Sequence, residues 1–94
     1  MMELYCTYDK VAQRFEAPAP FISRPVAIRA FKNVIDNESS FTGINYRDFD
    51  LMFVGSFDET TGIITACNPQ FVCSGLEVRS DDNVPEKDTE SSNQ

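Results

Sequence analysis

One segment of this chain, Ser23 to Asn37, has the repeat of an amphipathic helix. Its residues alternate between an apolar and a polar face at spacings of three and four. Ser23 is a natural N-cap, and Pro25 suits a first helical turn, where its missing N–H has no partner in any case. The apolar face comprises Ala27, Ile28, Phe31, Val34 and Ile35, and the polar face Arg29, Lys32, Asn33 and Asp36. With a single helix, the rest of the fold must come from strands.

The first strand is predicted over Met2 to Tyr8, where residues alternate with a period of two. This pattern turns Leu4, Cys6 and Tyr8 toward the core and Tyr5 outward. A short returning strand is expected at Arg14 to Glu16, with Phe15 pointing inward. The following Ala17 to Pro20 segment is expected to be a loop or an extended edge, because neither of its prolines can donate a backbone hydrogen bond.

A longer strand is predicted from Asp50 to Phe57, with apolar residues on both faces. That composition indicates a central strand, or one whose outer face meets a partner. Asp58 to Gly62 is predicted to form a tight turn, with Gly62 at positive φ, and Ile63 to Cys67 returns as the partner strand. Asn68-Pro69 should break this strand, Gln70 to Cys73 adds a short one, and Ser74-Gly75 ends the ordered part. One strand face is expected to carry Leu51, Phe53, Gly55 and Phe57, and the other Met52 and Val54.

The predicted fold class is therefore α+β: a small, mainly antiparallel sheet of three to five strands with one helix packed on one face. The helix joins the first strand to the hairpin, and a β-α-β crossover is the simplest such connection. Residues 1–79 form this single domain. Residues 80–94 are almost entirely polar, charged or Pro, so we expect a disordered acidic tail.

The charge and the missing residue types narrow the function. The net charge is −7, and from Asp50 onward nine acidic residues face only Arg79 and Lys87. Such a chain is repelled by nucleic-acid phosphates and by anionic membranes. There is no His, and the three cysteines do not have metal-ligand spacing, so free thiols are expected. We therefore predict no enzyme, no cofactor and no metal. We also predict no membrane contact, because no apolar run is long enough to span a bilayer.

Two groups of residues are candidates for contacts with other molecules. Arg24, Arg29 and Lys32 on the helix, with Tyr5 as a stacking ring, are the candidates for single-stranded DNA or a partner protein. Met52, Val54 and Ile64 would be exposed on the sheet face that one helix leaves uncovered, so they are candidates for weak self-association. In the alternative, Phe71, Val72 and Leu76 fold back over that face and keep the chain monomeric.

Several of these residues also form recognisable motifs. They are Leu4-Tyr5-x-x-Tyr8-Asp9, Pro20-Phe21, Ala27-Ile28-Arg29-Ala30-Phe31 and Asp48-Phe49-x-Leu51-x-x-x-Gly55-x-Phe57-Asp58-x-x-Thr61-Gly62. Together they resemble the small nonstructural protein of gokushovirus-type microviruses, which are single-stranded DNA bacteriophages of the Microviridae. The resemblance covers residues 2–64, and the hairpin motif is its most specific part.

The resemblance implies a viral protein that is made in the bacterial host cytoplasm and is absent from the mature virion. It implies an accessory role in viral DNA replication, which we expect to proceed through contacts with a viral replication protein or a host replication factor. Two alternatives remain: a modulator of another host protein, for example one that mimics nucleic-acid charge, and a weak single-stranded DNA-binding protein. The resemblance supplies no catalytic residue.

Overall fold

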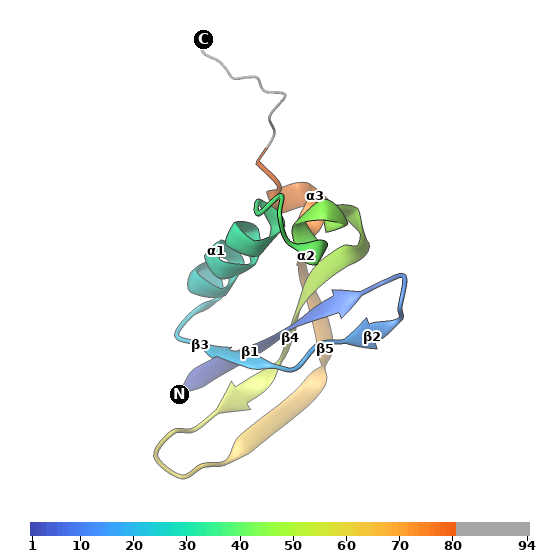
Figure 1. Cartoon of the computed structure of the whole chain (residues 1–94). Helices are drawn as coiled ribbons and strands as arrows, with labels where there is room; N and C mark the ends of the chain where they lie inside the picture. The colour runs from blue at the N-terminus through green and yellow to red at the C-terminus, as the bar shows by residue number, and fades with distance from the viewer. Residues whose placement is uncertain (81–94) are drawn as a thin grey trace.

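The computed structural model describes residues 1–80 of the chain. Figure 1 shows one curled sheet with the helices gathered over one end of it, while the β4–β5 hairpin extends away from them. The elements are, in order, β1 (Met2–Asp9), β2 (Arg14–Phe15), β3 (Ala19–Phe21), α1 (Arg24–Ile35), α2 (Phe41–Ile44), the 3₁₀ turn η1 (Tyr46–Asp48), β4 (Phe49–Phe57), β5 (Ile64–Ser74) and α3 (Gly75–Val78). The predicted α+β class is confirmed, and the expected tail lies outside the described residues except for Ser80.

The sheet is antiparallel throughout and has the order β2-β1-β4-β5, with β3 also paired to β1. The first strand of the chain is therefore central, and β5 forms one edge. The expectation of a β-α-β crossover is wrong, because such a connection makes its strands parallel whereas β1 and β4 are antiparallel. The chain reverses once after β1, as predicted, and β2 and β3 then run in the same direction along one edge of β1 before the chain enters α1.

The core lies between α1 and one face of the sheet. Its most deeply buried large side chains are Tyr5, Phe49 and Ile35, and it also contains Ala27, Phe31, Leu51 and Cys73. The outward orientation predicted for Tyr5 is wrong, because only 2% of this residue is exposed. Leu4 and Cys6 are buried as predicted, but on the opposite face. Period two could not decide which face the helix covers, because both alternating sets in β1 contain large apolar side chains.

A β-bulge at Val54 changes the faces of β4. Tyr5 lies opposite Phe53, but the preceding Leu4 lies opposite Gly55, so Val54 is the extra residue. A one-residue shift moves every later side chain to the other face. Phe57 therefore lies opposite Met2 on the face away from α1, and its predicted position beside Leu51 and Phe53 is wrong.

The last strand is longer than predicted, because Pro69 does not end it. Gly55 pairs with Ala66 and Phe53 pairs with Gln70, so three residues of β5, Cys67 to Pro69, lie opposite Val54 alone. A proline is tolerated at such a bulge because no ladder hydrogen bond is required of it. The two predicted strands are therefore one continuous strand, Ile64–Ser74.

Three short elements close the domain beside the end of α1. They are α2, η1 and α3, and position 43 within α2 requires glycine because a Cβ there would collide with the carbonyl of Asn37. The ordered part does not end at Gly75, because Ser74 and Glu77 form a capping box that starts α3. Ser80 then donates to the carboxylate of Asp36 through both its N–H and its hydroxyl. Within residues 1–80, no helix is long and apolar enough to cross a membrane.

Candidate protein-interaction surfaces

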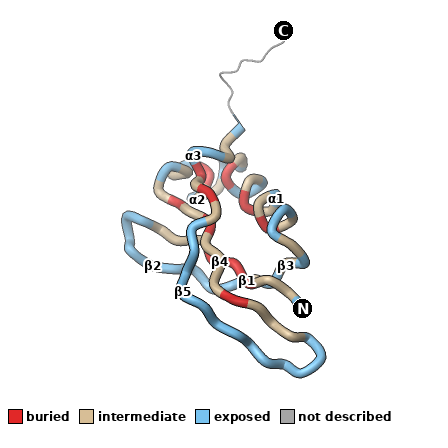
Figure 2. The backbone as a smooth tube through the Cα atoms, turned by 180° about the vertical axis from the view of Figure 1, so that it is seen from behind, coloured by how far each residue is buried: buried red, intermediate tan, exposed pale blue. Residues whose placement is uncertain are grey.

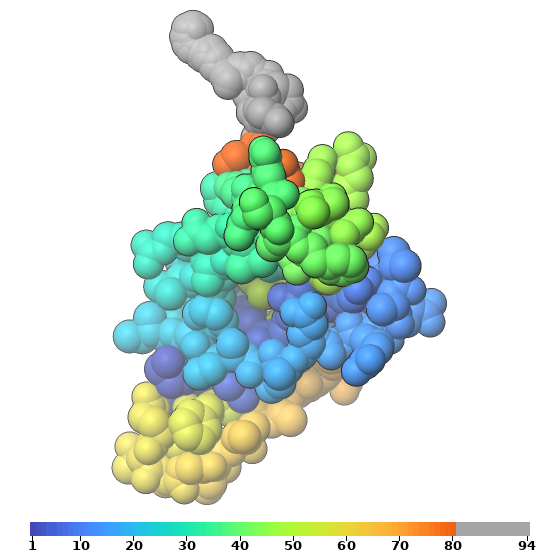
Figure 3. Space-filling model, viewed as in Figure 1, coloured from blue at the N-terminus to red at the C-terminus, as the bar shows by residue number. Residues whose placement is uncertain are grey.

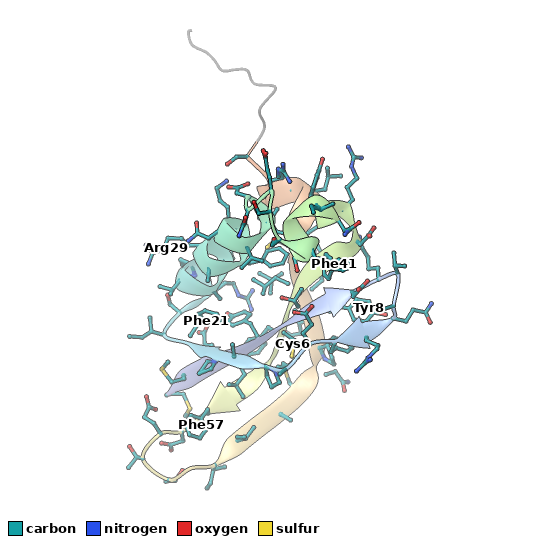
Figure 4. All side chains as sticks on the ribbon, viewed as in Figure 1. Cys6, Tyr8, Phe21, Arg29, Phe41 and Phe57 are labelled. Carbon is teal, nitrogen blue, oxygen red and sulfur yellow. The ribbon has the colours of Figure 1, made fainter. Side chains whose placement is uncertain are left out.

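The cationic residues predicted to bind DNA do not form a free cluster. The guanidinium of Arg24 lies 5.5 Å from the ring centroid of Phe53, and its Nε is 3.3 Å from the Tyr5 hydroxyl. The ammonium of Lys32 pairs with Asp36 at 2.9 Å and donates to the carbonyl of Val78 at 3.1 Å. Only Arg29 points into solvent without such a contact (Figure 4). A series of phosphates would therefore have to displace internal contacts of Arg24 and Lys32.

Tyr5 is a core residue and cannot offer its ring to a base. Its ring packs edge-on against Phe21 and Phe53, with centroids 6.0 and 5.4 Å away. Its hydroxyl donates to Glu3 and accepts from Arg24. Burial, followed by the hydrogen bond to Glu3, raises the pKa of Tyr5 above its ordinary value, so the phenol stays neutral. The role predicted for Tyr5 as a stacking platform is therefore wrong.

A cavity of about 240 Å³ opens between α1, β1 and the segment that leads into β3. Figure 3 shows it as a hollow at the centre of the molecule, below the helices. Its walls are apolar, and Thr7, Glu16 and Thr42 are its only polar lining residues. The apolar lining consists of Tyr5, Ala17, Ala19, Phe21, Ala27, Ala30, Phe31, Val34 and Leu51.

The sequence interpretation missed this cavity. Val34, assigned to the packed face of the helix, is 46% exposed because it stands at the cavity wall rather than in the core. The available signal was the four alanines among the lining residues. Ala27 and Ala30 lie one turn apart on α1, facing a chain segment that contains Ala17 and Ala19. Small side chains on two facing elements leave a space that larger ones would fill.

The predicted self-association residues all lie on β4 and β5. Ile64 is 63% exposed, whereas Met52 and Val54 are partly buried. Ile64 pairs with Phe57, and Phe71 pairs with Met52. These four residues lie on the sheet face away from α1. Of the residues in the fold-back alternative, Phe71 lies on this face beside Met52, but Phe71 and Leu76 are themselves more than half exposed. Figure 2 shows exposed residues along most of β5.

The thiols and carboxylates form no group of three or more that could hold a metal ion in the part of the chain that the structure describes. All three cysteines are free, and only Cys67 is exposed. Burial raises the pKa of the Cys73 thiol to about 11 and raises that of Cys6 as well, so both remain protonated and unreactive. Lys10 forms an ion pair with Asp50 at 3.5 Å. What the described surface offers is therefore an apolar cavity and an uncovered sheet face.

The family model described as Phage ORF5 protein matches residues 2–78. This match spans nearly all of the described fold, from the first residue of β1 to the last residue of α3. The chain belongs to this family, and it is therefore a bacteriophage protein. No curated protein and no solved structure matches it.

Proposed function

We propose that this protein is a nonstructural accessory protein of gokushovirus-type microviruses that assists viral DNA replication by binding a replication protein. Membership of the Phage ORF5 family supports a phage accessory role. The motifs of β1, α1 and the β4–β5 hairpin support the narrower assignment to microviruses. The replication role is inferred from that resemblance, together with a described surface that is suited to binding rather than to chemistry.

The cavity beneath α1 carries the proposal that this protein acts by contact. At about 240 Å³, it is smaller than the roughly 300–1,000 Å³ typical of pockets for cofactors and drug-sized ligands. It suits one large apolar side chain, the kind of anchor that dominates protein interfaces. Glu16 at its edge would pair with a basic group beside that anchor. The net charge of −7 likewise favours a basic partner, as proteins that handle DNA commonly are.

The viral replication initiator is the occupant to which this proposal commits. A phage with an early stop codon in this gene should produce less single-stranded progeny DNA than the parent phage. Unchanged DNA yields in such infections would refute the replication role.

The contribution of the cavity is tested by filling it. Ala17→Trp should place an indole in the cavity from an exposed chain segment, with little change in stability, and should abolish capture of the initiator from infected cells. Ala12→Trp is the matched control, because Ala12 is also exposed but does not line this cavity. Equal capture by both variants would exclude the cavity as the anchor site.

The same capture experiment distinguishes a replication factor from a modulator of another host protein, which the acidic charge also favours. Enrichment of the initiator or of host replication proteins supports the first role. Enrichment of a host nuclease or transcription factor supports the second, with its basic nucleic-acid surface bound by this acidic chain. Recovery of neither class contradicts both.

Direct binding of single-stranded DNA is the weakest alternative, since Tyr5 is buried and Lys32 is paired. Any such binding would rest on few phosphates and should weaken steeply with salt. A labelled oligonucleotide should therefore show no shift even at low salt; a shift that Arg29→Ala removes would revive this alternative.

The proposal also places the protein in the host cytoplasm and outside the virion, so immunoblots should detect it in infected cells and not in purified particles.

A further inference from the structure

A long stretch of the outer edge of β5 is open to solvent. Every residue from Thr61 to Phe71 is exposed, and β5 is the terminal strand of the sheet. From Ile64 to Ala66 the strand pairs with β4 on one side, and its other side has no neighbouring strand in the order β2-β1-β4-β5. Backbone donors and acceptors along such an edge are a template for another extended strand.

This edge lacks the charges by which edge strands are usually protected. All seventeen residues from Thr60 to Leu76 are uncharged, in a chain in which 24% of residues are charged. Lysine on the edge is a common means of preventing edge-to-edge pairing, and β5 has none. Pro69 interrupts the edge at the bulge but leaves the five residues Ile64 to Asn68 before it. An exposed uncharged edge with Ile64 at its start favours a bound strand over continued exposure to water.

We propose that a second copy of this chain covers this edge, by antiparallel pairing of β5 with β5 about a twofold axis beside Ala66. The occupant must be an extended strand, and it must match an edge that offers no charge to attract a charged peptide. β5 itself meets both conditions, and a twofold pairing satisfies the same backbone groups in both copies. β2 and β3, the other strands that border only β1, have two and three residues and are too short for the purpose.

The distribution of charge supports pairing at this position. The only charged residues of the hairpin beyond Phe57 are Asp58 and Glu59 at its turn. The described chain ends at Ser80, just after α3, which lies at the opposite end of the molecule from that turn (Figure 1), and the acidic segment 81–94 follows in the sequence. Six of the fourteen residues in this segment are charged, five of them acidic. Each chain carries a net charge of −7. Two copies that join through β5 meet at the part of the surface where their mutual repulsion is smallest.

Cys67 makes the arrangement directly testable. With the axis beside Ala66, each Cys67 lies opposite Thr65 of the partner, and the two Cys67 side chains are diagonal neighbours on one face. Such diagonal pairs are roughly 7–8 Å apart between Cα atoms. A short bis-maleimide should therefore join two chains through Cys67, the one exposed cysteine, while Cys6 and Cys73 stay buried and unreactive. The Cys67→Ser variant should give no crosslinked dimer.

Sedimentation of the full chain from micromolar to millimolar concentration provides the second test. The mass should rise from one copy toward two as the concentration increases. Thr65→Lys should weaken the dimer about tenfold or more, since it places two like charges as diagonal neighbours across the axis. Thr60→Lys, which makes the same change in charge in the exposed turn, should leave it unaltered.

These results separate edge pairing from the alternatives. A monomer at all concentrations, or equal dimerisation of Thr65→Lys and the parent, would overturn the proposal. Ile64 and Thr65 lie on opposite faces of the sheet, because Thr65 pairs with Ser56 and Ile64 with Phe57. A dimer that is broken by Ile64→Lys but not by Thr65→Lys would therefore be a face-to-face dimer. Strong crosslinking of Cys67 only when a phage protein is added would assign the edge to that partner instead. None of these outcomes depends on the proposed replication role.

Discussion

The ends of β4 and β5 that lie beneath α1 and the ends that form the hairpin turn belong to the same two strands but differ in what surrounds them. Near α1, Phe49, Leu51 and Cys73 lie in a core closed by Ile35 and Phe31. Beyond the Val54 bulge the same strands leave that core, and all of Ile64 to Phe71 is exposed. The difference teaches that the buried contacts of this fold are concentrated at one end, so changes at the other end should affect its stability less.

The largest expected effect compares one phenylalanine from each region. Phe49→Ala should lower the free energy of unfolding by about 3–5 kcal/mol, because it leaves a cavity where Phe49 is now fully buried. Phe71→Ala should lower it by less than about 1 kcal/mol, since the ring is already more than half exposed. Urea denaturation of both variants measures the two values. Similar losses would show that the hairpin belongs to the core after all.

Two glycines sharpen the comparison at its boundary. Gly55 has a φ of +148°, and a Cβ there would collide with the carbonyl of Thr65 on β5. Gly55→Ala should therefore cost about 2–3 kcal/mol, through both the backbone strain and this collision. Gly62 in the turn has a φ of +77° with open space around it, so Gly62→Ala should cost only about 1 kcal/mol. Thermal unfolding compares them, and a reversed order would mean that β5 does not hold Gly55 in place.

A third prediction asks where the stable region ends. Arg79 donates to the carbonyls of Ile35 at 3.3 Å and Gly43 at 2.9 Å, and it lies 4.5 Å from the ring centroid of Tyr46. Arg79→Ala should therefore cost about 1–3 kcal/mol. A chain that ends after Ser80 keeps these contacts and should melt within a few degrees of the full chain. A large drop for that shortened chain would show that residues 81–94 stabilise the domain.

The smallest expected effect is on how the stability of the fold depends on pH through Asp36. Burial alone would raise the pKa of Asp36, but hydrogen bonds from Lys32 and from both donors of Ser80 outweigh it and hold the pKa below its ordinary value. A carboxyl with a lowered pKa stabilises the fold above its unfolded pKa, and this contribution is lost as the pH falls through the folded value. Asp36→Asn should therefore lower stability at pH 7 but not at about pH 2. Denaturation of Asp36→Asn and of the parent chain across this range tests it, and an equal loss of stability at both pH values would contradict it.

Local signals in the sequence predicted the elements better than their faces. Ser23 and Pro25 placed the start of α1 correctly, and Gly62 identified the turn, because these positions depend on the backbone of a few neighbouring residues. The faces of β1 and β4 depend on which side α1 covers and on a bulge at Val54. Gly55 beside that bulge is the kind of residue that often marks one, but it does not specify which face the helix covers. Pro69 was misread for the same reason, since its tolerance depends on the partner strand.

The same limit applied to the candidate contacts. The three cations were correctly placed on or beside a helix, but only the fold reveals that Arg24 lies over Phe53 and that Lys32 binds Asp36 and Val78. The cavity arises where α1 faces the chain around Ala17 and Ala19, two elements whose distance no local pattern specifies. The exposure of Ile64, in contrast, was predictable, because one helix can cover only one of the two faces of a sheet.

The central position of β1 determines when this protein can fold. The ribosome makes β1 first, yet its principal neighbour is β4, and Tyr5 pairs with a residue 48 positions later, Phe53. Until that strand has been made, β1 can pair only with the short strands β2 and β3. Closing so long a loop carries an entropic cost that is recovered only when β4 docks. The sheet is therefore completed late in synthesis, and a nascent chain that stops before Phe49 offers α1 only β1 with the short strands β2 and β3.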